Sequence, residues 1–240
     1  MHVSSPGKVL LYASYWNLKW ICDKCVYIWQ RVIWQSMKET EMLPVDLHVH
    51  TLYSGDSSIT PKRLVDTLHS HPFLKTVAVT DHNTLEGYYF ASKLATAYQD
   101  ILIVPGIEAS TPYGDLIIVG TEERPPHPAM PEKLVEFAEE RNAITIIPHP
   151  YRAPSGLGDY ARRLKPTAVE VYNPTAMPVQ NRMAQQLAKE MKLPQVAASD
   201  AHNIEDLGAA YTKINATQNM DEILKAIKNG QTQPIQNPKK

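Results

Sequence analysis

The chain has 240 residues, 43% of them apolar and 20% charged, which is the length and composition of one ordinary globular domain. A formal net charge of −1 excludes the overall basic excess of most proteins that bind nucleic acid or anionic membranes. Cys22 and Cys25 are too few for a disulfide framework, and their CxxC lacks the second ligand pair of a structural zinc site. We therefore expect a protein of the reducing cytoplasm.

Residues 1–41 form an aromatic-rich extension, which we treat separately from a single predicted domain at 42–240. Lys19, Asp23 and Arg31 interrupt its apolar sequence, so it matches neither a membrane span of roughly 20 uncharged residues nor a signal peptide. Three interpretations stay open: a helix packed on the domain or a partner, an interfacial amphipathic segment, or upstream sequence included through a wrongly chosen start. We favour the third, because Met37 and Met42 directly precede the first predicted strand.

From Pro44 onward, short β-rich runs alternate with helical segments, which predicts a parallel sheet built from βα units. Continuous apolar runs such as ITII are typical of strands buried on both faces. The predicted strands are residues 45–50, 76–80, 101–108, 116–120, 143–148, 168–172 and 195–199. The predicted helices are residues 60–70, 85–98, 131–141, 179–192 and 221–229.

Several of these helices carry conventional end signals. Thr60 before Pro61 is a typical helix start, and Gly230 is a typical stop. Residues 122–131 and the tail after Gln231 contain prolines and are predicted as loops. The chain is shorter than the ~250 residues of an eight-stranded barrel. We therefore predict an α/β fold: a distorted seven-stranded (β/α) barrel, similar to a TIM barrel.

Residues able to bind metal follow several predicted strands. In the DLHVH segment, a period of two would put Asp46, His48 and His50 on one strand face. Other strand endings supply Asp81 and His82, Glu108, His149, and Asp200 and His202. The carboxyl ends of barrel strands form the usual position of an active site. Alone, each of these residues is more often a surface or structural group, but their repetition predicts a shared site.

Imidazole and carboxylate ligands suit zinc, manganese or iron. Glu108 is the natural bridge between the ions. Binding to the ions would lower the pKa of a water molecule toward ~7, which would produce hydroxide at neutral pH. The sequence contains no Gly-rich phosphate loop, Rossmann fingerprint or G-x-S-x-G motif. Metal-activated water is therefore the favoured chemistry.

The sequence resembles the polymerase and histidinol phosphatase (PHP) domain family. The resemblance is carried by DLHVHTLYSGDSSITP (46–61), VAVTDHNTLEGY (77–88), GIEAST (106–111), IIPHPYR (146–152), VEVYN (169–173) and ASDAHN (198–203). It implies two or three divalent metals at the barrel mouth. His48, His50 and Asp200 would bind the first, and Glu108 would bridge to its neighbours. Asp56, His82 and His202 would bind the second.

The resemblance leaves the third ion less defined. His149 matches the family pattern, but Asp115 stands where the family often has a histidine, and His127 is a rival donor. Arg152, next to the IIPHPY segment, is a candidate for binding the substrate phosphate through its forked guanidinium. Asp81 is a candidate for orienting a metal-bound imidazole. Asn173 could be purely structural.

We predict hydrolysis of a small phosphate ester or nucleotide by metal-activated water, with His202 or Asp200 transferring the proton to the leaving group and Glu108 holding the ions. Three alternatives stay open: an exonuclease-like activity on nucleic-acid ends, amide or other non-phosphate hydrolysis, and a non-catalytic metal-binding module. Few basic residues cluster in the tyrosine-containing loops, which favours a small substrate over a polymer. The sequence leaves the oligomeric state open.

Overall fold

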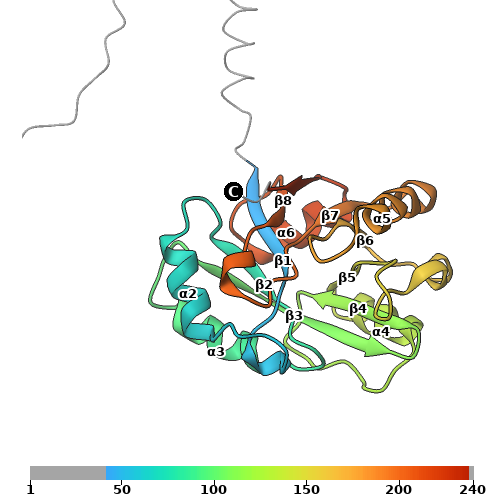
Figure 1. The fold of residues 1–240 in the computed structure, drawn as a ribbon. Coiled ribbons are helices and arrows are strands. Elements are labelled where there is room, and N and C mark those ends of the chain that lie inside the picture. Colours follow the sequence, from blue (N-terminus) through green and yellow to red (C-terminus); the bar gives the residue numbers. More distant parts are fainter. Residues whose placement is uncertain (1–41, 238–240) are drawn as a thin grey trace, which may run out of the picture. The chain divides into compact units, whose positions relative to one another are not determined.

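The computed structural model describes residues 42–237, which fold around one nine-stranded sheet (Figure 1). The strand order is β7-β6-β5-β4-β3-β2-β1-β8-β9. The bounds are β1 Leu43–Val49, β2 Thr76–Val79, β3 Leu102–Thr111, β4 Gly114–Val119, β5 Ile144–Ile147, β6 Ala168–Tyr172, β7 Gln195–Ala197, β8 Ala210–Ile214 and β9 Thr232–Gln236. The predicted extension at 1–41 lies outside the described residues, and the division of the chain at that point stays a prediction.

All seven predicted strands are present, but the prediction of a wholly parallel arrangement is wrong for β4. Strands β1, β2 and β3 are parallel, as are β5, β6 and β7, whereas β4 runs antiparallel to both β3 and β5. Only Pro112 and Tyr113 separate β3 from β4. A two-residue connection joins antiparallel strands, because a parallel crossover needs a dozen or more residues.

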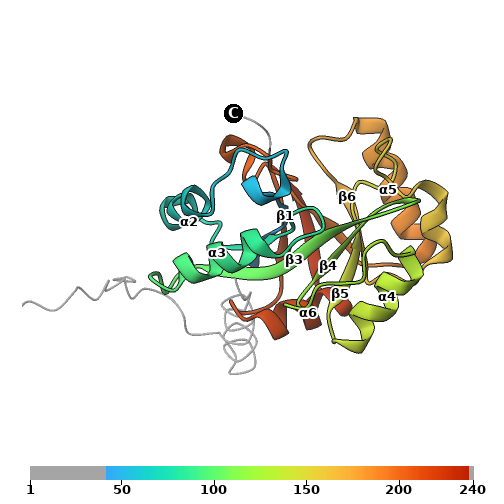
Figure 2. The same cartoon turned by 90° about the horizontal axis from the view of Figure 1, so that it is seen from below.

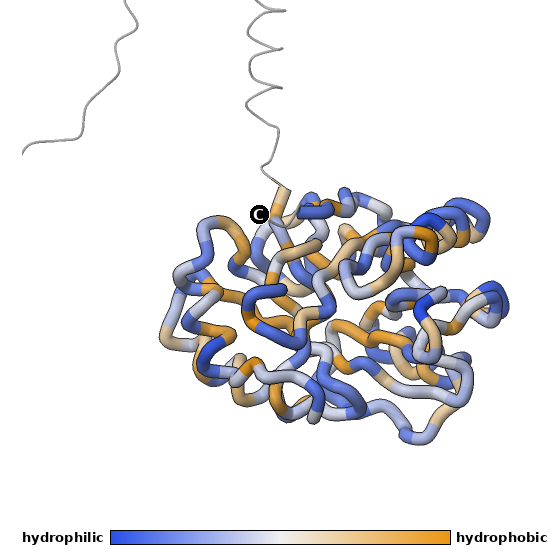
Figure 3. The backbone as a smooth tube through the Cα atoms, in the orientation of Figure 1, coloured by the Kyte–Doolittle hydropathy of each residue, from blue (hydrophilic) through white to orange (hydrophobic). Residues whose placement is uncertain are grey.

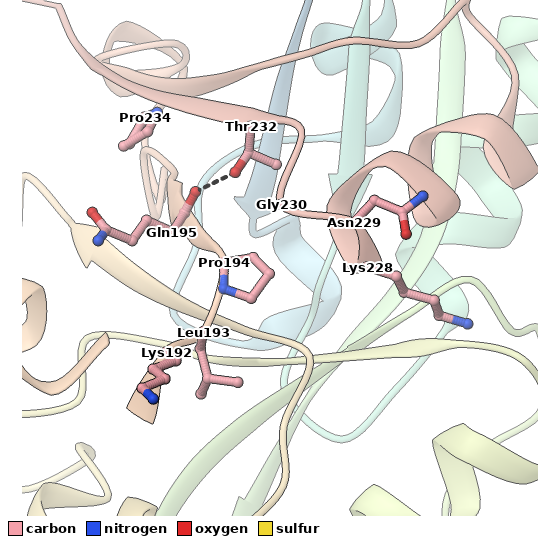
Figure 4. Close-up of a pocket in the computed structure, with 9 residues that line it drawn as sticks. All are labelled: Lys192, Leu193, Pro194, Gln195, Lys228, Asn229, Gly230, Thr232 and Pro234. Carbon is pink, nitrogen blue, oxygen red and sulfur yellow. Dashed lines mark hydrogen bonds between the residues drawn. The ribbon is translucent and has the colours of Figure 1, made fainter. Parts of the chain in front are cut away.

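The prediction of seven strands, with a loop after Gln231, is corrected by β8 and β9. Strand β8 pairs antiparallel with β1, and β9 pairs antiparallel with β8. Side chains then bring the open edge of the sheet toward β7: the Thr212 hydroxyl donates to the Ala197 carbonyl at 2.8 Å, and the Thr232 hydroxyl donates to the Gln195 carbonyl at 2.8 Å (Figure 4). The sheet is therefore barrel-shaped and nearly closed.

Five α-helices lie close to their predicted positions: α2 Pro61–Ser70, α3 Glu86–Ala95, α4 Pro131–Glu140, α5 Pro178–Met191 and α6 Met220–Lys228. The described residues also include the short 3-10 helices η1 Leu52–Ser54, η2 Gly158–Arg163 and η3 Ile204–Asp206. The Thr60 hydroxyl caps α2 by accepting from the Arg63 amide. Helices α2 and α3 flank the β1–β3 part of the sheet, and α4 and α5 flank the other part (Figures 1 and 2). Among residues 42–237, no helix has the length and apolar character needed to cross a bilayer.

Buried apolar side chains form three clusters around the sheet. One contains residues from both halves of the sheet, including Val45, Val104, Ile144 and Val196, together with Ile227 of α6. The other two pack the sheet against α2 and α3 and against α4 and α5. Hydrophobic segments accordingly lie in the middle of the fold, and hydrophilic segments follow its outer loops (Figure 3). Buried polar side chains also occur within the strands, but the buried histidines and most buried carboxylates lie toward the carboxyl ends of the strands.

A register shift in β1 prepares that polar end. The pairing of β1 with β2 changes between Asp46 and Val49. Val45 and Leu47 belong to one apolar cluster on one side of β1. The residue after Leu47, His48, lies on that same side, where its ring contacts Glu108. A β-bulge puts successive side chains on one side in this way. The period-two prediction that Asp46 shares the histidine face is therefore wrong, because the Asp46 carboxylate points to backbone amides outside that face.

Candidate metal centre

The predicted ligands converge at one mouth of the sheet. They come from β1 (His48), the segment just after it (His50 and Asp56), the segment after β2 (His82), β3 (Glu108), and the turns after β5 (His149) and β7 (Asp200 and His202). The end of β1 meets the segment that follows β7, because Val49 forms a parallel bridge with Ala201. His149 and Asp200 have positive φ values of 27° and 51°. Such strain in residues other than glycine concentrates at functional sites.

Ligand atoms within 4.8 Å of one another form three groups among the described residues. The first is partly exposed and contains His50, Asp56, His82 and His202. The other two are buried and contain His48, Glu108 and His149, and His48, His50 and Asp200. His48 and His50 each belong to two groups, so the groups form one continuous cluster. All eight residues assigned as ligands by the family motifs lie within it.

The spacing of the atoms fits divalent ions. With metal–nitrogen and metal–oxygen bonds of about 2.0–2.1 Å, neighbouring ligands in a tetrahedral site lie about 3.3 Å apart. The Nε2 atom of His50 lies 3.2 Å from Glu108 Oε2 and 3.3 Å from Asp200 Oδ1. His82 Nδ1 lies 3.3 Å from Glu108 Oε2, and His202 Nε2 lies 3.2 Å from Asp56 Oδ2. The residues present therefore fit the divalent metal ions that the resemblance implies.

Two buried atoms also support a bound ion, because each lies close to other ligand atoms without forming a hydrogen bond. Within residues 42–237, neither Asp200 Oδ1 nor His82 Nδ1 has a hydrogen-bond partner. The other oxygen of Asp200, Oδ2, accepts from Arg152 Nη1 at 2.5 Å and from Asn173 Nδ2 and Thr175 Oγ1 at 3.1 Å each. Buried polar atoms normally have partners. An ion coordinated by Asp200 Oδ1 and by the rings around it would supply what is missing.

The ionisation of the cluster also suits a cation. Burial alone would lower the pKa of His48, but the Asp200, Glu108 and Glu170 carboxylates hold it well above its ordinary value. Burial alone would raise the pKa of Glu108, yet His48 and His149 hold it well below its ordinary range. The pKa of Asp200 is likewise depressed, since His48 and His50 outweigh its burial. Protons on the histidines thus balance the carboxylates, and bound cations would replace those protons.

The residues considered for a third ion are placed differently. Asp115 is buried on β4 but belongs to none of the three ligand groups. Burial raises its pKa, and the nearby Glu108 carboxylate raises it further. His127 is exposed in the loop before α4 and also belongs to no group. His149, in contrast, places its Nε2 atom 3.0 Å from Glu108 Oε1.

Arg152 and Asp81 both lie beside the ligands, with different partners. The Arg152 guanidinium contacts Asp200 and the Thr175 hydroxyl, so it faces the metal cluster. The carboxylate of Asp81 instead accepts from the Thr51 amide at 2.5 Å and the Thr51 hydroxyl at 2.6 Å. These bonds tie the end of β1 to the segment after β2, and a role of Asp81 in orienting an imidazole stays a prediction.

Two groups that orient histidine rings were missed. The Glu170 carboxylate on β6 lies 3.1 Å from His48 Nδ1, and the Ser54 hydroxyl lies 2.9 Å from His50 Nδ1. Both residues stand inside segments that carry the family resemblance, VEVYN and DLHVHTLYSGDSSITP. Their place inside these segments was the one sign in the sequence that they belong to the site. A glutamate within an apolar strand does not indicate which residue it contacts.

The barrel-shaped sheet and the ligand groups at its mouth define the class of protein: an α/β barrel with a candidate multi-metal centre. A family profile described as PHP domain matches residues 46–154, and one described as PHP-associated matches residues 178–232. The uncharacterised protein MJ1587 of Methanocaldococcus jannaschii is 32% identical over 142 residues, which cover 55% of this chain and 82% of that protein. The chain therefore belongs to the PHP domain family.

Other relatives agree with this placement. The uncharacterised protein MJ0417 of the same organism is 30% identical over 183 residues, which cover 72% of this chain and 71% of that protein. The crystal structure of PsfC from Pseudomonas syringae is similar in fold, with a TM-score of 0.63, 20% identity and coverage of 83% of this chain and 93% of that one. An amidohydrolase from Chromobacterium violaceum matches with a TM-score of 0.55, 16% identity and coverage of 68% and 89%. A Bifidobacterium adolescentis protein, provisionally named a metal-dependent phosphoesterase, matches with a TM-score of 0.53, 15% identity and coverage of 66% and 87%.

Proposed function

We propose that the protein is a metal-dependent hydrolase that cleaves a phosphate ester of a small molecule, with two or three zinc, manganese or iron ions. The observation that carries the proposal is the cluster of imidazole and carboxylate atoms with a guanidinium at its edge. Divalent ions held there would lower the pKa of a bound water and polarise a phosphoryl oxygen. His48, His50, Asp56, His82, Glu108, His149, Asp200 and His202 are the proposed ligands, with Glu108 in contact with four histidines.

Arg152 is proposed to bind the substrate phosphate. Its Nη1 atom lies 2.5 Å from Asp200 Oδ2, and a quarter of the side chain is exposed at the mouth. A guanidinium presents several donors in a plane, so it can bind two phosphate oxygens while it stays beside the ligands. Its positive charge also offsets the carboxylates, which would otherwise repel an anionic substrate.

His202 is proposed to carry the proton to the leaving group. Its side chain is 27% exposed, and its Nδ1 atom lies 2.9 Å from the Asp200 carbonyl oxygen, so the ring is held at the rim. Asp200 is a poorer proton donor, because the depressed pKa keeps its carboxylate ionised. We propose His202 as the donor, a role that requires its Nε2 atom, 3.2 Å from Asp56 Oδ2, to carry a proton instead of an ion and is therefore an alternative to its role as a ligand.

The test is a substrate screen with the purified full-length protein in manganese, zinc or iron. We expect hydrolysis of at least one phosphomonoester or nucleotide, and its loss in the His48→Ala/Glu108→Ala double variant. Arg152→Lys should mainly raise KM for that substrate, whereas substitution of the exposed Glu136 by glutamine should change nothing. Cleavage of amides alone, or of single-stranded oligonucleotide ends alone, would replace this proposal. A chain that binds metal but cleaves none of these classes would be a non-catalytic metal-binding module.

A further inference from the structure

We infer that Glu170 selects the ring tautomer of His48, and so determines which His48 nitrogen is free to bind a metal ion. Glu170 is thus a positioning residue that acts through His48. The inference rests on the proposed metal centre but not on the identity of the substrate. It concerns a residue that lies outside the three ligand groups.

Glu170 reaches His48 inside the barrel. It lies on β6, is 1% exposed, and places Oε1 3.1 Å from His48 Nδ1 although the two residues are 122 positions apart. An ionised carboxylate only accepts hydrogen bonds. The proton of a neutral His48 ring must therefore be on Nδ1, and the lone pair must be on Nε2.

The Nε2 lone pair faces the space where a metal ion would be bound. His48 Nε2 lies 3.0 Å from His50 Nε2 and 3.3 Å from each of Glu108 Oε2 and Asp200 Oδ1. The other tautomer would point an N–H group into this space. A metal ion bound there would then compete with a proton.

The remaining oxygen of Glu170 prevents the carboxylate from turning away. Oε2 accepts from the His149 amide at 2.7 Å and from Asn173 Nδ2 at 2.9 Å. Three donors therefore hold one side chain, and two of them are independent of His48. The same contact with the His149 amide links Glu170 to the turn that carries another proposed ligand.

Glutamine at this position tests the inference, because it keeps the shape and changes the donor pattern. If its amide oxygen faces the His149 amide and Asn173, its NH₂ group faces His48 Nδ1 and favours the opposite tautomer. If the amide turns over, NH₂ meets the two donors instead, at the cost of two hydrogen bonds. The first orientation leaves one conflict, at His48, and the second leaves two, so the first is preferred.

The experiment measures metal binding rather than turnover. Zinc and manganese are titrated into the metal-free, full-length wild type, Glu170→Gln and the matched surface variant Glu136→Gln by calorimetry. We expect Glu170→Gln to weaken binding at the sites that contain His48 by 10–100-fold, the usual effect of removing a hydrogen-bond partner of a metal ligand. The group of His50, Asp56, His82 and His202 lacks His48 and should keep its affinity.

Two further readouts separate this role from a merely structural one. Nitrogen NMR of the zinc-loaded wild type should show His48 protonated at Nδ1, and this signal should be lost in Glu170→Gln. In a His48→Ala background, Glu170→Gln should cause no further loss of affinity, because the two changes act through one ring. Additive losses, or an unchanged His48 signal, would overturn the inference. A wild type that binds metal in this manner but cleaves no phosphate ester would refute the proposed function alone, and a wild type that binds no metal would refute both.

Discussion

Replacing Gly87 by alanine should damage the metal centre although Gly87 bears no functional group. Gly87 lies in the first turn of α3. A Cβ atom on this residue would lie 1.9 Å from Asp81 Oδ2 and 2.2 Å from Thr51 Oγ1, so neither atom can keep its place. Those atoms form the contact between the segments that carry His50 and His82. The methyl group therefore pushes two strand ends apart.

The free energy can be worked from the contacts that are lost. Asp81 accepts two hydrogen bonds from Thr51, and each bond to a charged group contributes about 1.5–3 kcal/mol. Alanine in a helix recovers about 1 kcal/mol relative to glycine. The net destabilisation is then about 2–5 kcal/mol. For a protein of this size it corresponds to a fall in Tm of roughly 10 °C.

Calorimetric unfolding of the metal-free full-length chain measures this change, and zinc titration measures the effect on the ligands. Gly158→Ala is the control, because Gly158 has φ +54° and, its two chain neighbours aside, no atom of the described part of the chain lies within 4 Å of the added Cβ. Only backbone strain of about 1–2 kcal/mol acts there. We expect Gly87→Ala to lower Tm further and to weaken zinc binding, with the control keeping wild-type affinity. An equal fall in Tm for the two variants would refute the reasoning.

Two other predictions address the closure of the sheet and its ionisation. Thr212→Val should reduce the free energy of unfolding by about 2–4 kcal/mol in urea titrations, because the buried Ala197 amide and carbonyl each lose the Thr212 hydroxyl; an unchanged midpoint would contradict this. Burial alone would lower the pKa of His50, but Asp200 and Glu108 raise it from 6.5 to about 9. A raised pKa contributes stability that is complete below pH 6.5 and lost as the pH rises through 9, so unfolding of the metal-free protein should become easier by about 3 kcal/mol over that window. A His50→Asn variant should show a flatter profile, and equal profiles would contradict the assignment.

Most of the strands that the sequence predicted contain a short run of apolar residues buried in the sheet. Strands β8 and β9 lack it. The sequence of β8 alternates buried and half-buried residues, and β9 is partly exposed and contains Pro234. Their extended form is stabilised by the pairing of β8 with β1 and of β9 with β8, and their short, partly polar sequences lack the apolar runs that mark most of the other strands. Tertiary contacts therefore determine the two strands that nearly close the barrel.

The candidate ligands were accessible to sequence reasoning because strand ends converge at one mouth, so each ending needed only a recognisable side chain. Glu170 was not, because it sits in the middle of AVEVY and its partner is 122 residues away. The face of Asp46 was also mispredicted, since a bulge in β1 interrupts the alternation of side chains. Residues at strand ends are thus easier to assign than residues whose role depends on register.

Asp46 itself explains how the mouth is built. At its base, β1 pairs with β8, since Leu43 lies opposite Ile214 and Val45 opposite Thr212. Near the mouth, β1 meets the segment after β7 instead, where the His50 amide donates to the Ala201 carbonyl at 3.0 Å.

Asp46 stands where the partner changes. Its buried carboxylate accepts from the Ser199 amide at 3.0 Å and the Gly208 amide at 3.2 Å. Burial raises its pKa to about 6, so an ionised carboxylate is retained there at a cost in stability. That cost is offset by satisfying two amides which sheet pairing leaves without partners at the change of strand. The first residue of DLHVH thus supports the junction that brings His48 and His50 to Asp200.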